Sequence, residues 1–126
     1  MRNLIPLMFI LTIFSCNEND VIPTLDIFNE WEWIMTTFDT RGKIITAQKL
    51  DSTYFYTFTK DGLLQMKDNN RELKNQFNFE LVEDDPFNRI VIDDLGLTWG
   101  YSIKSDTLRL WEPHSIFPRT HIFKKH

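Results

Sequence analysis

The stretch TYFYTFTKDGLLQM, residues 53–66, indicates the architecture of the whole chain. Large apolar side chains recur at every second position on both sides of a central turn. They are Tyr54, Tyr56, Phe58, Leu64 and Met66. Alternation with a period of two is typical of a β-strand with one buried face. The dipeptide Asp61-Gly62 between the two runs is a strong hairpin signal, so the stretch predicts two antiparallel strands.

The same alternation continues along the chain in both directions. Further strands are expected at residues 31–36, 76–83, 89–92, 97–104, 107–112 and 119–125, and Ile44–Leu50 is either a short strand or part of a long loop. In the first of these, the alternation places Trp31, Trp33 and Met35 on one inner face. About eight short strands joined in sequence order, without a long helical pattern, favour an all-β fold. We therefore expect an up-and-down antiparallel β-barrel, which leaves no open edge.

The N-terminus has the layout of a secretory signal. Arg2 precedes eleven residues without a charge, 4–14, and the small Ser15 stands before Cys16, the only cysteine of the 126 residues. Eleven residues rise about 16 Å as a helix, whereas the hydrocarbon core of a bilayer is about 30 Å thick, so this run is too short to span it. An incidental or buried thiol is the alternative reading of Cys16.

Residues 13–16, Ile-Phe-Ser-Cys, resemble a bacterial lipobox. The resemblance implies that lipid is attached to the Cys16 sulfur and that cleavage makes this residue the new N-terminus. Three segments follow from it: a signal peptide at 1–15, the lipidated cysteine and a tether at 16–24, and a barrel domain at 25–126. The predicted location is the cell envelope, where the lipid on Cys16 anchors the protein to the outer membrane, periplasmic or surface-exposed.

Composition bounds the function further. The formal net charge is −4 and the acidic residues are scattered, whereas nucleic-acid binding requires clustered basic residues, so a nucleic-acid partner is not expected. Sixteen aromatic residues follow Cys16 and supply a core that needs no disulfide.

The order of several short motifs resembles the small lipocalin-like lipoproteins of Bacteroidota. The motifs are Asn29-Glu30-Trp31, which is similar to the lipocalin Gly-x-Trp signature, Phe58 to Gly62, Tyr101 to Ile103, and Asp106 to Leu110. The resemblance covers roughly residues 25–126 and implies a lipocalin-like barrel whose floor is closed by Trp31. It also implies a late arginine packed over that tryptophan, for which Arg119 is the candidate by position.

No set of residues in the sequence forms a recognisable catalytic pattern. A Gly-x-Ser-x-Gly motif and a phosphate-binding glycine loop are both missing, and lipidation would occupy the only cysteine. The three histidines and Glu112 have no spacing typical of a metal site, and the pairs Asp84-Asp85 and Asp93-Asp94 fall in predicted turns. We therefore expect no enzyme activity, no metal and no cofactor.

The aromatic inner face is the candidate site. It predicts a calyx that holds a small apolar ligand, lined by Trp33, Tyr54, Tyr56, Phe58, Phe77, Phe79, Trp99 and Tyr101. The alternative is that these rings fill the barrel and that the protein is an envelope interaction module with a protein partner. Phe55 and Trp111 are expected on the outer face, where exposure would favour a partner surface.

Overall fold

The computed structural model describes residues 26–40, 42–83 and 87–126. Cys16 and the expected segments 1–15 and 16–24 lie outside the described residues, as do Asp84 and Asp85. The described strands are β1 (Glu30–Phe38), β2 (Lys43–Thr46), β3 (Phe55–Phe58), β4 (Leu63–Lys67), β5 (Leu73–Asn78), β6 (Glu80–Val82), β7 (Asn88–Ile92), β8 (Leu97–Lys104), β9 (Thr107–Trp111) and β10 (Arg119–Lys125). Two short helical turns, α1 (Ala47–Leu50) and η3 (Asp93–Leu95), complete the described elements. None of the helices in this described part has the length and apolar character needed to cross a membrane.

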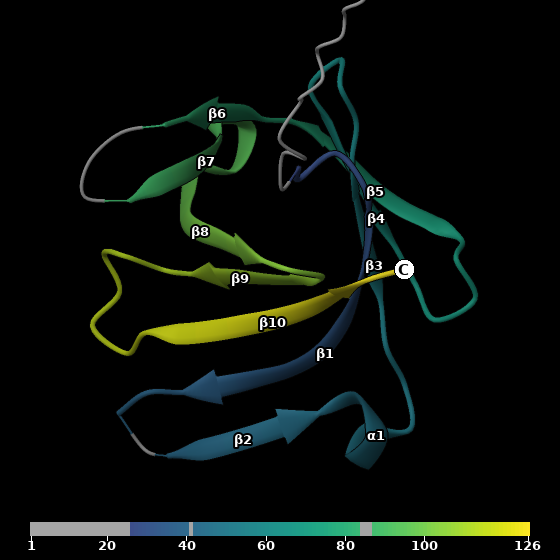
Figure 1. Ribbon diagram of the computed structural model, residues 1–126, viewed down its shortest axis with the longest axis vertical. Coiled ribbons are helices and arrows are strands. Elements are labelled where there is room, and N and C mark those ends of the chain that lie inside the picture. The colour runs from purple at the N-terminus through teal and green to yellow at the C-terminus, as the bar shows by residue number, and fades with distance from the viewer. Residues whose placement is uncertain (1–25, 41, 84–86) are drawn as a thin grey trace, which may run out of the picture.

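The strands form one antiparallel sheet that curls into a nearly closed barrel (Figure 1). The order of neighbours is β5-β4-β3-β1-β10-β9-β8-β7-β6, and β2 pairs with β1 outside this path. Only Phe79 separates β5 from β6, and these strands pair with β4 and β7 at the two ends of the path. The segment 73–82 therefore acts as one bent strand that joins the ends, and the ring has the eight positions of the predicted up-and-down, lipocalin-like barrel.

Local turn chemistry explains why consecutive strands return on themselves. Gly62 adopts φ +88° in the predicted β3–β4 turn, where the Thr59 hydroxyl accepts a hydrogen bond from the Leu63 amide at 3.0 Å. Gly96 (φ +60°) ends η3 before β8, and Ser105 (φ 59°) turns β8 into β9. Glycine adopts such positive φ angles without a steric penalty, which places the turns at Gly62 and Gly96 where the sequence predicts them.

A β-bulge in β1 corrects the expected inner face. Trp33 pairs with Phe123 of β10, but the next pair joins Met35 to Ile122, so one extra residue lies between the two pairs. Because an extra residue reverses the alternation, Thr36 and not Met35 follows Trp33 on the inner face. Thr36 is accordingly the only buried polar side chain among the described residues, with 7% of its surface exposed.

The uncertain segment Ile44–Leu50 contains two kinds of structure. Its first part belongs to β2, which forms a hairpin with the second half of β1. The Thr46 side chain then accepts a hydrogen bond from the Lys49 amide at 3.0 Å and caps the single helical turn α1. The first half of β1 pairs instead with β3. The helical turn α1 therefore connects β2, which lies beside the second half of β1, to β3, which lies beside the first half.

One end of the barrel, which we call the floor, is filled by side chains. Trp31 is 1% exposed at the start of β1, and its indole N–H donates to the Ile27 carbonyl oxygen at 2.9 Å. Phe58 packs edge-on against Phe79, with ring centroids 5.2 Å apart. The remaining fully buried large side chains are Leu64, Ile90, Ile92, Leu108, Leu110 and Phe123. The opposite end, where β1 ends and β10 begins, is called the mouth below.

Other side chains cover the two outer aromatic residues, Phe55 and Trp111. They therefore do not form the exposed partner surface that their outward positions could have provided. Phe55 is only 5% exposed, because the Arg71 guanidinium lies 4.9 Å from its ring centre and the His126 ring meets it edge-on at 5.4 Å. Trp111 is half-buried and lies against Phe87, with ring centroids 5.7 Å apart. Both residues alternate with inner-face neighbours as expected, but neither offers a free apolar surface.

Candidate functional site

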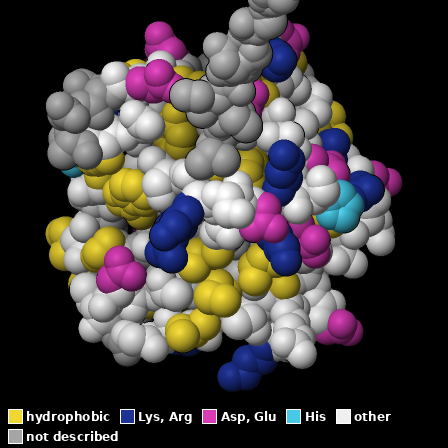
Figure 2. Space-filling view, in the orientation of Figure 1, with side chains coloured by type: hydrophobic (Ala, Val, Ile, Leu, Met, Phe, Trp, Pro, Cys, Tyr) yellow, Lys and Arg dark blue, Asp and Glu magenta, His cyan; other side chains and the backbone are white. Residues whose placement is uncertain are grey.

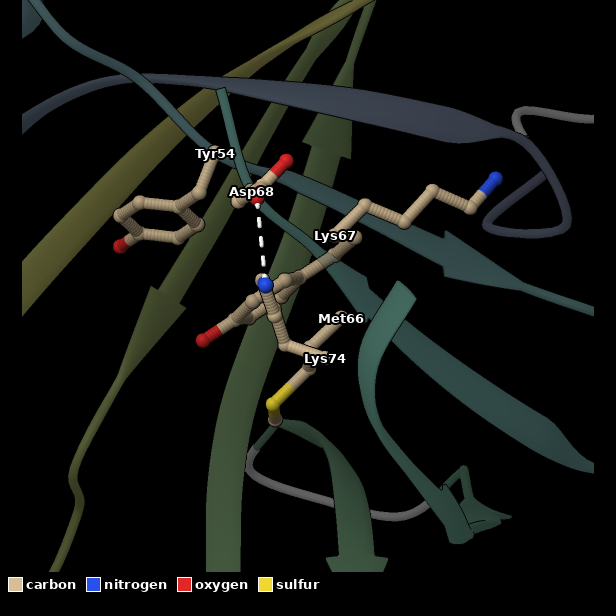
Figure 3. A pocket seen from close by; sticks show the side chains of 6 residues that line it. Tyr54, Met66, Lys67, Asp68 and Lys74 are labelled. Atoms are coloured by element: carbon tan, nitrogen blue, oxygen red, sulfur yellow. Dashed lines mark ion pairs between the residues drawn. The ribbon is translucent and has the colours of Figure 1, made fainter. Parts of the chain in front are cut away.

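A hollow of about 270 Å³ opens on the inner side of the barrel beneath the β4–β5 hairpin (Figure 3). We call it the tyrosine hollow, and it is lined by Tyr54, Tyr56, Met66, Lys67, Asp68 and Lys74. The pairing of Tyr56 with Met66 across β3 and β4 brings these two side chains onto the same face. In Figure 3 the Lys74 amine reaches Asp68, while Lys67 extends away from it. The hollow therefore has an apolar wall and a charged rim.

Aromatic rings support that wall from behind. Trp33 stacks on Tyr54 with ring centroids 5.1 Å apart and planes inclined by 10°, and Trp99 stacks on Tyr56 at 5.9 Å. The Phe123 ring contacts both tyrosines, 5.8 Å from Tyr54 and 5.0 Å from Tyr56, and the two tyrosine rings are themselves 5.2 Å apart. Stacked and edge-on pairs of this kind stabilise ring positions, so the two tyrosines form a fixed surface.

The eight candidate calyx residues divide into three groups. Tyr54 and Tyr56 line the tyrosine hollow, and Trp33 and Trp99 pack behind them. Phe58, Phe77 and Phe79 belong to the packing at and near the floor, where Phe77 lies opposite Leu64. Tyr101 lines a different hollow of about 260 Å³, formed with Ile27, Phe28 and Leu81. Rings thus fill the floor, while a smaller part of the aromatic face lines open hollows.

Polar side chains line the mouth of the barrel, and we call them the mouth cluster: Thr36, Glu112, Arg119 and His121. The Thr36 hydroxyl lies 2.8 Å from His121 Nδ1, and the Arg119 guanidinium binds Glu112 through Nε at 3.1 Å and Nη2 at 2.5 Å. His121 Nε2 faces Glu112 Oε2 at 4.0 Å. Hollows of about 310 and 380 Å³ lie on either side of the Glu112–Arg119 pair.

A chain of hydrogen bonds joins Trp33 to His121 in the mouth cluster. The Trp33 indole nitrogen can only donate, and it donates to the Thr36 hydroxyl oxygen at 2.9 Å. The Thr36 hydroxyl in turn lies within hydrogen-bond distance of His121 Nδ1, and the direction of this bond depends on the tautomer of His121. The other ring nitrogen, Nε2, faces Glu112. Through Thr36, the bulge in β1 connects the aromatic wall to the charged pair at the mouth.

Arg119 does not have the role that the lipocalin resemblance implies. It pairs in register with Phe38 at the far end of β1, whereas Trp31 stands at the start of that strand opposite Lys125. A bidentate bond to Glu112 holds the guanidinium at the mouth instead. The arginine expected over Trp31 is therefore not Arg119.

Sequence reasoning missed the mouth cluster, although the signal was available. In β10 the inner positions are every second residue back from Phe123, namely His121 and Arg119. In β9 the same alternation includes Leu108 and Leu110, and Glu112 takes the next position of this series, directly after the strand. Three polar residues thus continue two apolar inner faces towards one end of the barrel. Their meeting depends on the pairing of β9 with β10.

Burial controls the protonation of His121. Removal from water lowers the pKa of the His121 imidazole, and the Arg119 charge lowers it further, while Glu112 acts in the opposite direction. In the folded protein the imidazole therefore stays neutral at a pH at which an unfolded histidine already binds a proton.

Stability is expected to decrease as the pH falls below about 6.5, the ordinary histidine pKa. The unfolded chain binds a proton there that native His121 does not, so the free energy of unfolding decreases until the folded-state pKa is passed. Urea unfolding at about pH 7.5 and about pH 5.5 measures this difference. We expect His121→Gln to reduce the difference and His114→Gln, at an exposed position, to leave it unchanged. An equal difference in all three proteins would contradict the assignment to His121.

The other titratable candidates are dispersed. His126 Nδ1 lies 3.5 Å from Glu32 on the outer surface, and Asp93 and Asp94 form η3 as the predicted turn. Within the ranges that the structure describes, no three His, Cys, Asp or Glu side chains come together as a potential metal site.

Fold and site together define a small antiparallel barrel with a filled floor, an aromatic wall and a polar mouth. No model of a known protein family matches the chain, and no curated protein matches its sequence.

Proposed function

We propose that this protein binds a small apolar molecule in the tyrosine hollow. The main support for this proposal is the position of Tyr54 and Tyr56. Stacked tryptophans lie on one side of them, and they line an open hollow of about 270 Å³ on the other. A volume of this size is close to the lower limit of small-molecule pockets, which is about 300 Å³. The hollow therefore suits a molecule of one or two rings, or one end of a longer molecule.

The proposal also places the protein in a lipocalin-like group of envelope lipoproteins without enzyme activity. Its support is the order of sequence motifs together with the barrel, and the lipobox-like residues before Cys16 support an anchor in the outer membrane. Metabolic fatty-acid labelling tests the anchor, since label on a Cys16→Ala variant would rule it out.

Filling the tyrosine hollow should abolish binding without unfolding the barrel. We expect the full chain to bind N-phenyl-1-naphthylamine, a neutral fluorescent probe, in a saturable manner. Met66 is half-buried at the edge of the hollow, so Met66→Trp should occupy the space and weaken probe binding at least about tenfold. Fluorescence titration measures the affinity, and circular dichroism checks the fold.

A matched control tests the position of the site. Leu73→Trp adds the same ring at an exposed position of β5 that does not line the hollow, and it should leave the affinity unchanged. Absence of saturable binding in the wild-type chain would reject the ligand-binding function.

A second candidate function is a protein-interaction module of the cell envelope. The observation that favours it is the β9–β10 loop, where Ile116 is 85% and Phe117 63% exposed. Figure 2 also shows hydrophobic side chains between charged ones on the face that it presents. A wild-type chain that binds no probe, together with an Ile116→Ser and Phe117→Ser variant that loses a cross-linked envelope partner, would support this function instead.

A further inference from the structure

We propose that the tyrosine hollow selects a neutral ligand that carries an oxygen acceptor, such as a carbonyl group, and that the Tyr54 and Tyr56 hydroxyls donate hydrogen bonds to it. This inference rests on the proposed ligand-binding function and adds the chemical class of the ligand. Its basis is the hydrogen-bonding state of the two tyrosines and the pairing of the charges around them.

Both tyrosine hydroxyls are available as donors. Neither forms a hydrogen bond with any other residue in the described part of the chain, although both side chains are half-buried. Figure 3 shows the Tyr54 hydroxyl pointing away from the Asp68–Lys74 ion pair, so the rim charges do not occupy it. Neither hydroxyl is among the buried polar atoms without a partner, so both reach the surface of the hollow, where a ligand acceptor can take the place of water.

The protonation state of these hydroxyls supports donation. Burial raises the pKa of Tyr56 to about 12, and burial together with the neighbouring Tyr56 raises the pKa of Tyr54 even further. Both groups therefore keep their protons throughout the physiological range. The stacking of Tyr54 on Trp33 and of Tyr56 on Trp99 holds the rings, so little side-chain freedom is lost when a ligand binds.

The surrounding charges favour a neutral ligand. Lys74 lies 3.1 Å from Glu72 and 3.6 Å from Asp68, and Lys67 lies 3.2 Å from Glu30.

Across the barrel, the Glu112 carboxylate holds the Arg119 guanidinium in a bidentate pair. Each of these cations thus already has an acidic partner, and a charged ligand would have to displace one of them. Because an ionised group is costly to bury without a partner, an uncharged acceptor fits this site better.

Two competitors of nearly the same shape test the inference. 2-Acetylnaphthalene and 2-isopropylnaphthalene differ mainly in the replacement of a carbonyl oxygen by a methyl group. Each is used to displace N-phenyl-1-naphthylamine from the full chain. A net hydrogen bond of ordinary strength predicts that the acetyl compound binds about 3- to 10-fold more tightly than its hydrophobicity alone would allow.

Removing the hydroxyls assigns the preference to particular residues. The double variant Tyr54→Phe and Tyr56→Phe should keep the fold and bind the fluorescent probe, but its ratio of acetyl to isopropyl affinity should fall by about 3- to 10-fold relative to wild type. Tyr101→Phe is the matched control, since Tyr101 is buried and lines the other hollow, and its ratio should equal that of wild type.

The outcomes separate the two proposals. If the probe binds but the ratio is the same in the wild type and the double variant, the hydroxyls are not the donors and the inference is overturned, while the ligand-binding function stands. If Tyr101→Phe changes the ratio as much as the double variant does, the preference does not belong to the tyrosine hollow. If the wild-type chain binds no probe, both proposals fail together.

Discussion

Replacing Trp31 by alanine is expected to lower the free energy of unfolding by about 3–5 kcal/mol, the range for truncating a buried aromatic side chain. Trp31 is 1% exposed, and its indole N–H is bonded to the Ile27 carbonyl oxygen. The variant would leave a void at the floor and would also remove the bond that holds the segment before β1 against the core. Chemical unfolding followed by circular dichroism measures the loss.

Two further variants identify the cause of this loss. Trp31→Phe keeps most of the buried volume but removes the indole N–H, so it should lose about 1–2 kcal/mol. Trp111→Ala truncates the same side chain at a half-buried outer position and should lose less than half as much as Trp31→Ala. A Trp31→Ala protein within about 1 kcal/mol of wild type would show that the floor can collapse around the void.

The second large effect is expected at Gly100, where a single methyl group should cost about 2–3 kcal/mol of stability. Gly100 of β8 pairs with Trp111 of β9, and the indole of Trp111 occupies the space where a side chain at Gly100 would begin. A Cβ atom at Gly100 would stand 2.7 Å from the Trp111 Cζ2 atom and still closer to two other indole atoms. Gly100→Ala must therefore push the indole away from the sheet and from Phe87.

A double-mutant cycle tests this explanation. If the indole is the obstacle, Gly100→Ala should be much less destabilising when Trp111 is already replaced by leucine, and the two losses should not add. Ser102→Ala, two residues along the same face of β8 and exposed, should leave the stability unchanged within about 0.5 kcal/mol. Additive losses for Gly100→Ala and Trp111→Leu would mean that the contact is not responsible.

The two halves of the barrel have different physical characters, and this difference underlies the proposed function. The floor resembles any closely packed core, so substitutions there should change stability. The tyrosine hollow is backed by the stacked rings of Trp33 and Trp99 and opens beside the Asp68–Lys74 ion pair. Tyr54→Phe and Tyr56→Phe should consequently change ligand selection more than they change folding.

The strands could be predicted from the amino-acid sequence alone, because alternation with a period of two is a local property of the backbone. It was sufficient for the order of hairpins, for the Asp61-Gly62 turn and for the aromatic character of the inner face. The number of ring positions also followed from it, since consecutive short turns leave each strand beside the next.

Which residues form the site depends on contacts between distant parts of the chain. The bulge after Trp33 places Thr36 on the inner face. No local sequence pattern predicts this bulge, because the pairing of β1 with β10 sets its position. The alternation predicts that Phe55 points outward, but the side chains of Arg71 and His126, from distant parts of the chain, cover its ring. The division of the aromatic face into a filled floor and an open tyrosine hollow has the same origin, because it depends on how side chains from all strands share one enclosed volume.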